Sequence, residues 1–303
     1  MTAVTRNAPS YDLPEGARHV RADLADPSTL GAAVTGADAL FLLPAGELLG
    51  GGAPATEVLD VARSGGVCRV TLLSSQVTGV RPGAPTHGRL REFEEAVRSS
   101  GLDWRILRPG GFASNAYAWA ETVRTRRTVH APFAEVALPV VDPADIGAVA
   151  AVVLREQVNA GQTYELTGPT PVTPRAQAKA LAGALGEEVR FLELSREQAR
   201  EHMARFMPEP VVDGTLDILG EPLPSERRVA PDIEKRSSAV RPVPSRPGRP
   251  ATPRPSGRRP ADGEAAEKTT RAGRGGGGGG EKAPPTPRGL GGKKTPPKPG
   301  AHL

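Results

Sequence analysis

Apolar runs of strand length alternate with longer segments of helical periodicity along most of the chain. The apolar runs predict strands at residues 18–24, 38–44, 68–75, 103–112, 137–141, 162–168 and 189–195. The helical pattern predicts helices at residues 26–36, 56–66, 89–101, 142–154, 173–186 and 195–207. Residues 3–7, AVTRN, read as one more strand that ends in a basic turn, and the pattern fades after 209–223. Such alternation predicts an α/β fold with a parallel sheet covered by helices.

Local signals support several of these elements. Asp26, with a proline after it, is typical of a helix start, and Gly36 can take the left-handed conformation that ends that helix. Ser195 and Gln198 have the spacing of a capping box. Residues 38–44 are almost continuously apolar, which predicts a strand covered on both faces.

The end of the chain differs in composition from the rest. Residues 241–303 contain 13 Pro and 14 Gly but no aromatic residue, so they cannot bury enough apolar surface to fold. A disordered tail is therefore predicted over 226–303. The tail could be a Pro-rich ligand or a polyanion-binding arm, and a frame-shifted reading of a GC-rich gene is an equal alternative.

The charge distribution argues against a nucleic-acid partner. The whole chain has a net charge of +5, but residues 241–303 alone carry 14 Lys and Arg against 4 Asp and Glu. The body is therefore mildly acidic, and no specific binding of nucleic acid is expected.

Cysteine usage and the length of the apolar runs indicate the compartment. The single Cys68 excludes an internal disulfide, and its apolar neighbours predict a buried, inert thiol. The apolar runs are too short to span a bilayer, so no membrane association is expected. A cytoplasmic protein is predicted. The histidines lack metal-ligand spacing, so no metal site is expected.

Seven landmarks occur in one order along the chain: AVTRN, VRADLADPSTL, GADALFLLP, RVTLLSS, SGLDWRILRPGGFASN, LPVVDPADIGAVAAVVL and YELTGP. From about residue 2 to about 225 this series resembles the atypical short-chain dehydrogenase/reductase family, in particular its NmrA-like and NAD(P)H-dependent quinone- or azo-reductase-like members. The resemblance implies a Rossmann-like NAD(P)-binding domain over 1–225, in which 113–225 contribute the substrate region.

The resemblance also implies roles for individual residues. Arg6, after the opening strand, corresponds to the basic residue that meets the adenosine 2′-phosphate, which favours NADP(H) over NAD(H), since a guanidinium suits a phosphate. The implied cofactor-binding residues are Arg6, Asp23, Leu24, Leu43, Pro44, Ser74, Ser75, Gln76, Pro109, Gly110, Gly111 and Phe112. The implied substrate-pocket residues are Asn115 and Tyr117, and His87 is a candidate because it follows the strand ending in LLSS.

One part of the family pattern is missing. A strand, a G-x-x-G-x-x-G turn and a helix are expected before AVTRN, because they supply the pyrophosphate anchor and the middle strand of the sheet. Without them, two half-sheets with unpaired inner edges are expected. The simplest interpretation is a truncated gene model. GGGAPA at 50–55 matches G-x-G-x-x-A, but its distance from the preceding strand predicts a flexible loop.

The catalytic group is not evident. None of the tyrosines is followed four residues later by lysine, so the Tyr-x-x-x-Lys pair of classical members is absent from the sequence. The leading hypothesis is hydride transfer from NAD(P)H to a small acceptor such as a quinone. The alternatives are a non-catalytic NAD(P)-sensing regulatory protein and an inactive fragment that lacks the dinucleotide loop. The sequence does not indicate an oligomeric state.

Overall fold

Parallel strands separated by helices form the body of the protein in the computed structural model, which describes residues 1–10, 12–155 and 160–230. The strands are β1 (Thr2–Thr5), β2 (Arg18–Arg21), β3 (Ala39–Leu42), β4 (Arg69–Leu73), β5 (Asp103–Pro109), β6 (Thr128–Pro132), β7 (Gln162–Leu166) and β8 (Arg190–Leu194). The α-helices are α1 (Gly31–Val34), α2 (Ala55–Ser64), α3 (Val77–Val80), α4 (Gly88–Ser99), α5 (Ala120–Arg126), α6 (Pro143–Arg155), α7 (Pro174–Leu185), α8 (Arg196–Met203) and α9 (Glu209–Gly220). The 3₁₀ helices are η1 (Pro27–Leu30), η2 (Gly46–Leu49), η3 (Pro85–His87) and η4 (Ala113–Trp119).

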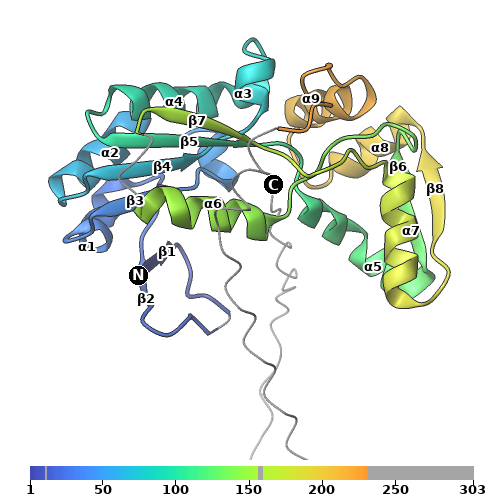
Figure 1. Ribbon diagram of the computed structural model, residues 1–303, viewed down its shortest axis with the longest axis horizontal. Coiled ribbons are helices and arrows are strands. Elements are labelled where there is room, and N and C mark those ends of the chain that lie inside the picture. The colour runs from blue at the N-terminus through green and yellow to red at the C-terminus, as the bar shows by residue number, and fades with distance from the viewer. Residues whose placement is uncertain (11, 156–159, 231–303) are drawn as a thin grey trace, which may run out of the picture. The chain divides into compact units, whose positions relative to one another are not determined.

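The main sheet has the order β3-β4-β5-β7, and all of its pairs are parallel. Helices α2 and α4 cover one face of this sheet and α6 covers the other (Figure 1). One apolar core, which includes Leu72, Phe93 and Ile106, lies under α2 and α4. A second core, which includes Leu107 and Ile146, lies under α6. This arrangement confirms the predicted α/β class with helices on both faces.

The first two strands form a separate ribbon. β1 pairs with β2 in parallel, from Thr2 opposite Arg18 to Thr5 opposite Arg21. Within the described part of the chain, no strand pairs with the other edge of β1 or with the free edge of β3. The two half-sheets with unpaired inner edges are therefore as predicted. The apolar strand 38–44 is not covered on all sides, because Phe41 and Leu43 are exposed by 36% and 46%.

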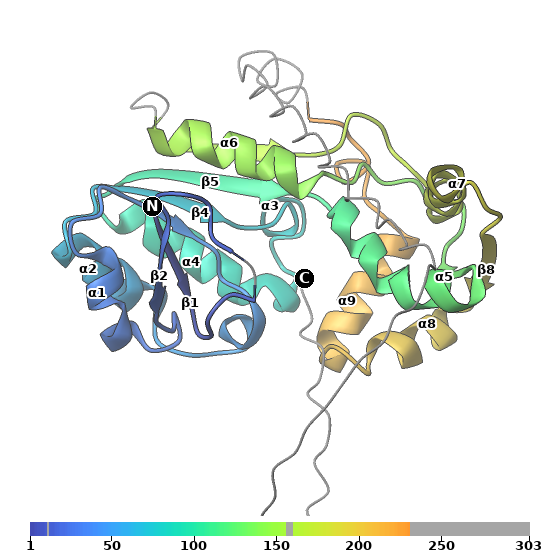
Figure 2. The same ribbon diagram turned by 90° about the horizontal axis from the view of Figure 1, so that it is seen from below.

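Residues 113–230 build a smaller region beside the main sheet. Strands β6 and β8 pair in parallel and pack against α7 and α8 (Figure 1), and Figure 2 shows β8 with these two helices from below. Phe133, between β6 and α6, takes a left-handed backbone conformation with φ of 55° and packs beside α9 near Gly220. The body extends at least to Ala230, which is buried. The predicted tail lies outside the described residues from 231 onward.

The structure confirms the helix starts and ends predicted from short sequence patterns. Asp26 accepts a hydrogen bond from the Ser28 N–H, although the helix it begins opens with the 3₁₀ turn η1. Gly36 has a φ of +73°. The capping box of Ser195 and Gln198 is present at α8.

Two further expectations are wrong, and one strand was missed. Residues 137–141 do not form a strand, because this segment makes only the isolated bridges of Leu138 with Val172 and Val141 with Phe112. Strand β6 was not expected. Cys68 is exposed, because it precedes β4 and its thiol donates to the Asp38 carbonyl at the end of the sheet.

Candidate functional site

The carboxyl ends of the parallel strands bring several predicted site residues to one edge of the main sheet. Leu43 and Pro44 follow β3, Ser74 to Gln76 follow β4, and Pro109 to Phe112 end β5 and continue into the next turn. Ligands bind at this edge in open α/β sheets, so the placement agrees with the expected region.

Gln76 and Gly110 form the best-defined part of this edge. The Gln76 N–H donates to the Pro109 carbonyl at 2.9 Å, and the Gly110 N–H donates to the Leu166 carbonyl at 2.8 Å. A Cβ atom on Gly110 would lie 3.4 Å from the Gln76 Oε1 and 3.4 Å from the Pro139 carbonyl oxygen. The backbone here is therefore held close to its neighbours, and glycine keeps this turn narrow.

The turn after Gly110 is fixed from a second side. The Val141 N–H donates to the Gly111 carbonyl at 2.8 Å, and the Ala113 N–H donates to the Val141 carbonyl at 2.9 Å. Phe112 is half-buried and packs against the core under α6. The predicted residues 109–112 are thus presented by a rigid turn.

The serines after β4 are engaged within the protein. Ser74 is buried, and its hydroxyl donates to Glu94 Oε1 at 2.6 Å. The Ser75 hydroxyl accepts from the Val77 N–H at 3.2 Å. Both side chains therefore shape the start of α3, and the Ser74 hydroxyl faces the interior.

Glu94 of α4 is a buried hub that sequence reasoning missed. Its carboxylate is 2% exposed and accepts from Thr78 at 2.7 Å, from Arg108 Nε at 2.9 Å and Nη2 at 2.6 Å, and from Arg98 at 2.9 Å, in addition to Ser74. Burial opposes ionisation, but the hydrogen bonds from Arg108, Ser74 and Thr78 outweigh it and lower the pKa of Glu94 to about 2. Helix α4 is thereby tied to β4, β5 and α3.

At the other end of the edge, Arg6 follows β1 and is exposed. Its Nη2 lies 3.9 Å from the position of a Cβ atom on Gly46, in the segment after β3. Asp23 Oδ1 accepts from the Ala25 N–H at 2.9 Å, and Leu24 packs against the core. Arg6 therefore reaches the carboxyl edge, while Asp23 stabilises the loop after β2.

Two backbone amides of the loop at 50–55 are engaged within the protein. The Ala53 N–H donates to the Ala25 carbonyl, and the Ala55 N–H donates to Glu92 Oε1. Arg89 donates to the carbonyls of Leu48 and Ala53 and to Glu92. These bonds hold the loop against Ala25 after β2 and against the start of α4.

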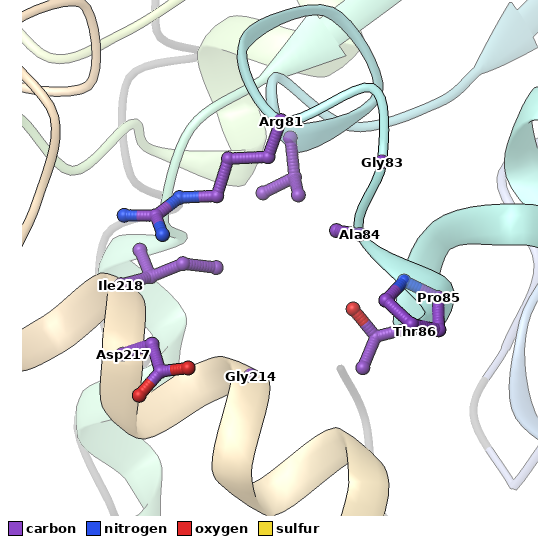
Figure 3. A pocket seen from close by; sticks show the side chains of 9 residues that line it. Arg81, Gly83, Ala84, Pro85, Thr86, Gly214, Asp217 and Ile218 are labelled. Carbon is purple, nitrogen blue, oxygen red and sulfur yellow. The ribbon is translucent and has the colours of Figure 1, made fainter.

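A cavity of about 460 Å³ opens beside this edge, between the segment after β4 and helix α9 (Figure 3). Its lining residues are Val77, Arg81, Gly83, Ala84, Pro85, Thr86, Gly214, Asp217 and Ile218. Helix α9 approaches closely, since a Cβ atom on Gly214 would lie 3.0 Å from Thr86 Cγ2. Local sequence patterns could not reveal this cavity, because its two walls lie more than a hundred residues apart in the chain.

The predicted substrate residues lie outside the lining of this cavity. His87 is half-buried next to Thr86, whose hydroxyl lies 2.9 Å from His87 Nδ1. Burial, with a contribution from the Arg91 charge, lowers the pKa of His87 and keeps the ring neutral at neutral pH. Asn115 is exposed, and Tyr117 is 80% exposed. The structure does not bring these three residues together.

The described helices include none that is long and apolar enough to cross a membrane.

A family model described as NAD(P)H-binding matches residues 1–157. The chain is 32% identical over 203 residues to a (4-alkanoyl-5-oxo-2,5-dihydrofuran-3-yl)methyl phosphate reductase of Streptomyces griseus, covering 66% of this chain and 71% of that protein. It is 30% identical over 210 residues to an NAD(P)H azoreductase of Xenophilus azovorans, covering 67% and 71%.

A solved structure has a fold similar to that of this chain. The NADPH-dependent quinone oxidoreductase of Escherichia coli, in complex with NADPH, has a TM-score of 0.60 and 21% identity, covering 79% of this chain and 89% of that one. The family match spans more than half of the chain, and the chain covers over two thirds of the Streptomyces reductase. By fold and by sequence, this chain belongs to the NAD(P)H-binding family.

Proposed function

We propose that the protein is an NAD(P)H-dependent oxidoreductase that reduces a small acceptor such as a quinone. The cavity that begins at Val77 carries this proposal, because it offers space for an acceptor beside the carboxyl edge of the sheet. Val77 directly follows Gln76, which lies close to Gly110. The relatives named for azo and quinone reduction support the same reaction class.

The residues at the edge fit the two ends of the cofactor. The Arg6 guanidinium can hold an adenosine 2′-phosphate, and the narrow turn at Gly110, with buried Gln76, can border the nicotinamide. The G-x-x-G-x-x-G spacing expected of the turn that holds the pyrophosphate does not occur among residues 1–10, 12–155 and 160–230. When bound, the nicotinamide supplies a hydride, and one proton from solvent completes reduction of a quinone to a hydroquinone.

In this proposal, the residues of this chain position the cofactor and the acceptor. The 109–112 turn and the buried Gln76 lie beside the cavity, and the segment 77–86 and helix α9 form its two walls. His87, beside Thr86, adds no charge near the cavity at neutral pH, because burial lowers its pKa. Proximity of donor and acceptor is the main requirement of such a reaction.

Turnover with NADPH tests the proposal directly. The purified full chain should oxidise NADPH in the presence of a quinone, with one NADPH consumed per quinone, as followed by absorbance. Binding of NADPH without turnover of quinones or azo compounds would contradict the proposed reductase activity. The alternative of a non-catalytic, cofactor-sensing protein would then remain. Absence of any binding would contradict both.

The choice of NADP(H) over NAD(H) rests on Arg6. Replacing Arg6 with Gln should raise the Kd for NADPH about tenfold or more and leave the Kd for NADH nearly unchanged, because only NADPH carries the 2′-phosphate. The matched control is Arg18→Gln, an exposed arginine on the same ribbon that opens β2 beside Thr2 at the opposite end. Equal effects of the two substitutions, or equal effects on both cofactors, would argue against a phosphate contact at Arg6.

A further inference from the structure

The cavity wall contains a cation whose charge is cancelled by a buried carboxylate. Arg81, which lines the cavity, donates from Nε to Glu226 Oε1 at 2.7 Å and from Nη2 to Glu226 Oε2 at 2.9 Å. The Arg81 side chain is 23% exposed, whereas that of Glu226 is 3% exposed. Arg81 therefore lines the cavity (Figure 3), and its counter-ion Glu226 is buried.

Glu226 is fixed in this position by the segment that carries it. The Leu223 N–H donates to Glu226 Oε2 at 2.7 Å, and Arg81 Nη2 also donates to the Glu221 carbonyl at 3.1 Å. Four residues beyond Glu226, the Ala230 N–H donates to the Thr167 hydroxyl at 2.8 Å, a buried contact after β7. The segment 221–230 is thus anchored to the main sheet, and the carboxylate is preorganised for Arg81.

The other charged side chain of the lining is also paired. Asp217 of α9 accepts a hydrogen bond from Arg196 of α8. Much of the remaining lining is apolar, from Val77, Ala84, Pro85 and Ile218. The wall therefore offers apolar contacts and two paired charges, a combination that suits an uncharged ligand.

We propose that Glu226 sets the charge preference of the cavity, so that its pairing with Arg81 makes the site select uncharged, largely apolar acceptors over anionic ones. This inference rests on the proposed function in taking the cavity as the acceptor site. Hydrogen bonding to Glu226 raises the pKa of Arg81, and a guanidinium without this partner would still be protonated. Removal of the Glu226 charge alone would therefore leave a positive charge on the cavity wall.

Two dyes that differ by one sulfonate test the inference: 4-dimethylaminoazobenzene and its 4′-sulfonate, methyl orange. Their Kd values are measured on the full chain by absorbance titration, which does not depend on turnover. Glu226→Gln should increase the affinity for the sulfonated dye relative to the neutral dye by about tenfold or more, because the Arg81 guanidinium without its hydrogen-bonded counter-ion attracts the sulfonate. Glu121→Gln is the matched control, since it removes an exposed Glu–Arg pair in α5 and should leave the ratio unchanged.

Two further variants separate charge from loosening of the fold. Arg81→Gln leaves the carboxylate in place and should lower the relative affinity for the sulfonated dye severalfold. The double variant Arg81→Gln with Glu226→Gln should return the ratio to that of the unchanged chain. If Glu226→Gln does not fold, Arg81→Gln decides by itself.

The outcomes distinguish this inference from the proposed function. An unchanged dye ratio in Glu226→Gln, or a gain that persists in the double variant, overturns the role of Glu226. Failure of the unchanged chain to bind either dye overturns it as well. The expected ratios without any NADPH-dependent reduction would support the charge preference and contradict the proposed function.

Discussion

Replacing Glu94 with Gln is expected to lower the free energy of unfolding by about 3 kcal/mol. The buried carboxylate accepts hydrogen bonds from Ser74, Thr78 and two arginines, and an amide cannot accept from all of these donors at once. A pKa of about 2 instead of 4.5 corresponds to a stabilisation of the same size, at about 1.4 kcal/mol for each pKa unit. Urea denaturation at pH 7 measures the loss.

The same carboxylate predicts a dependence of stability on pH. Because the folded protein holds the pKa of Glu94 below its unfolded value, the stabilisation is complete above about pH 4.5 and is lost as the pH falls toward 2. Glu94→Gln should be less sensitive to pH in this window. The exposed neighbour Glu95 provides the control, and Glu95→Gln should change stability by less than about 0.5 kcal/mol. Equal stability of the two variants would show that the hub contributes little.

Replacing Gly168 with Ala should destabilise the protein by at least about 3 kcal/mol. A Cβ atom on Gly168 would lie 2.0 Å from the Val140 carbonyl oxygen, which is backbone and cannot rotate away. The segment around Val140 would have to move, and with it the bond from the Val141 N–H to Gly111 beside the candidate site. Thermal unfolding followed by circular dichroism would show a fall in Tm, and soluble yield would fall with it.

Gly147→Ala is the matched control for that substitution. Gly147 lies in α6, and a Cβ atom there would meet nothing within 4 Å. Because alanine favours the helix, this variant should gain about 0.5–1 kcal/mol. A Gly168→Ala variant as stable as Gly147→Ala would mean that the Val140 segment adjusts freely.

The elements that were predicted correctly are those that short segments of sequence determine. The helix that follows Asp26 and the capping box at Ser195 depend on contacts within about three residues. The parallel strands follow from apolar runs long enough to cross a sheet. The strand predicted at 137–141 does not form, because the segment pairs only at single positions, Leu138 with Val172 and Val141 with the 109–112 turn, and no continuous ladder results.

In the candidate site, too, the features that could be predicted are those that depend on short segments of sequence. The turn at Gly110 and the position of Arg6 at a strand end could be expected from sequence, because strand ends share an edge. The Glu94 hub and the Arg81–Glu226 pair could not, since each joins residues from different elements and neither has a local pattern. Ser74 illustrates the difference, because its place at the end of β4 could be expected from sequence, whereas its hydrogen bond to Glu94 could not.

The ribbon of β1 and β2 has a consequence for the energetics of the amino-terminal region. A pair of four-residue strands is only marginally stable without a third strand or a helix packed on it, and β1 has none paired on its far edge among the residues described. Although α1 contacts β2, we expect this pair to open more readily than the main sheet. A phosphate bound by Arg6 would slow that opening, so part of its binding free energy would be used to order the ribbon.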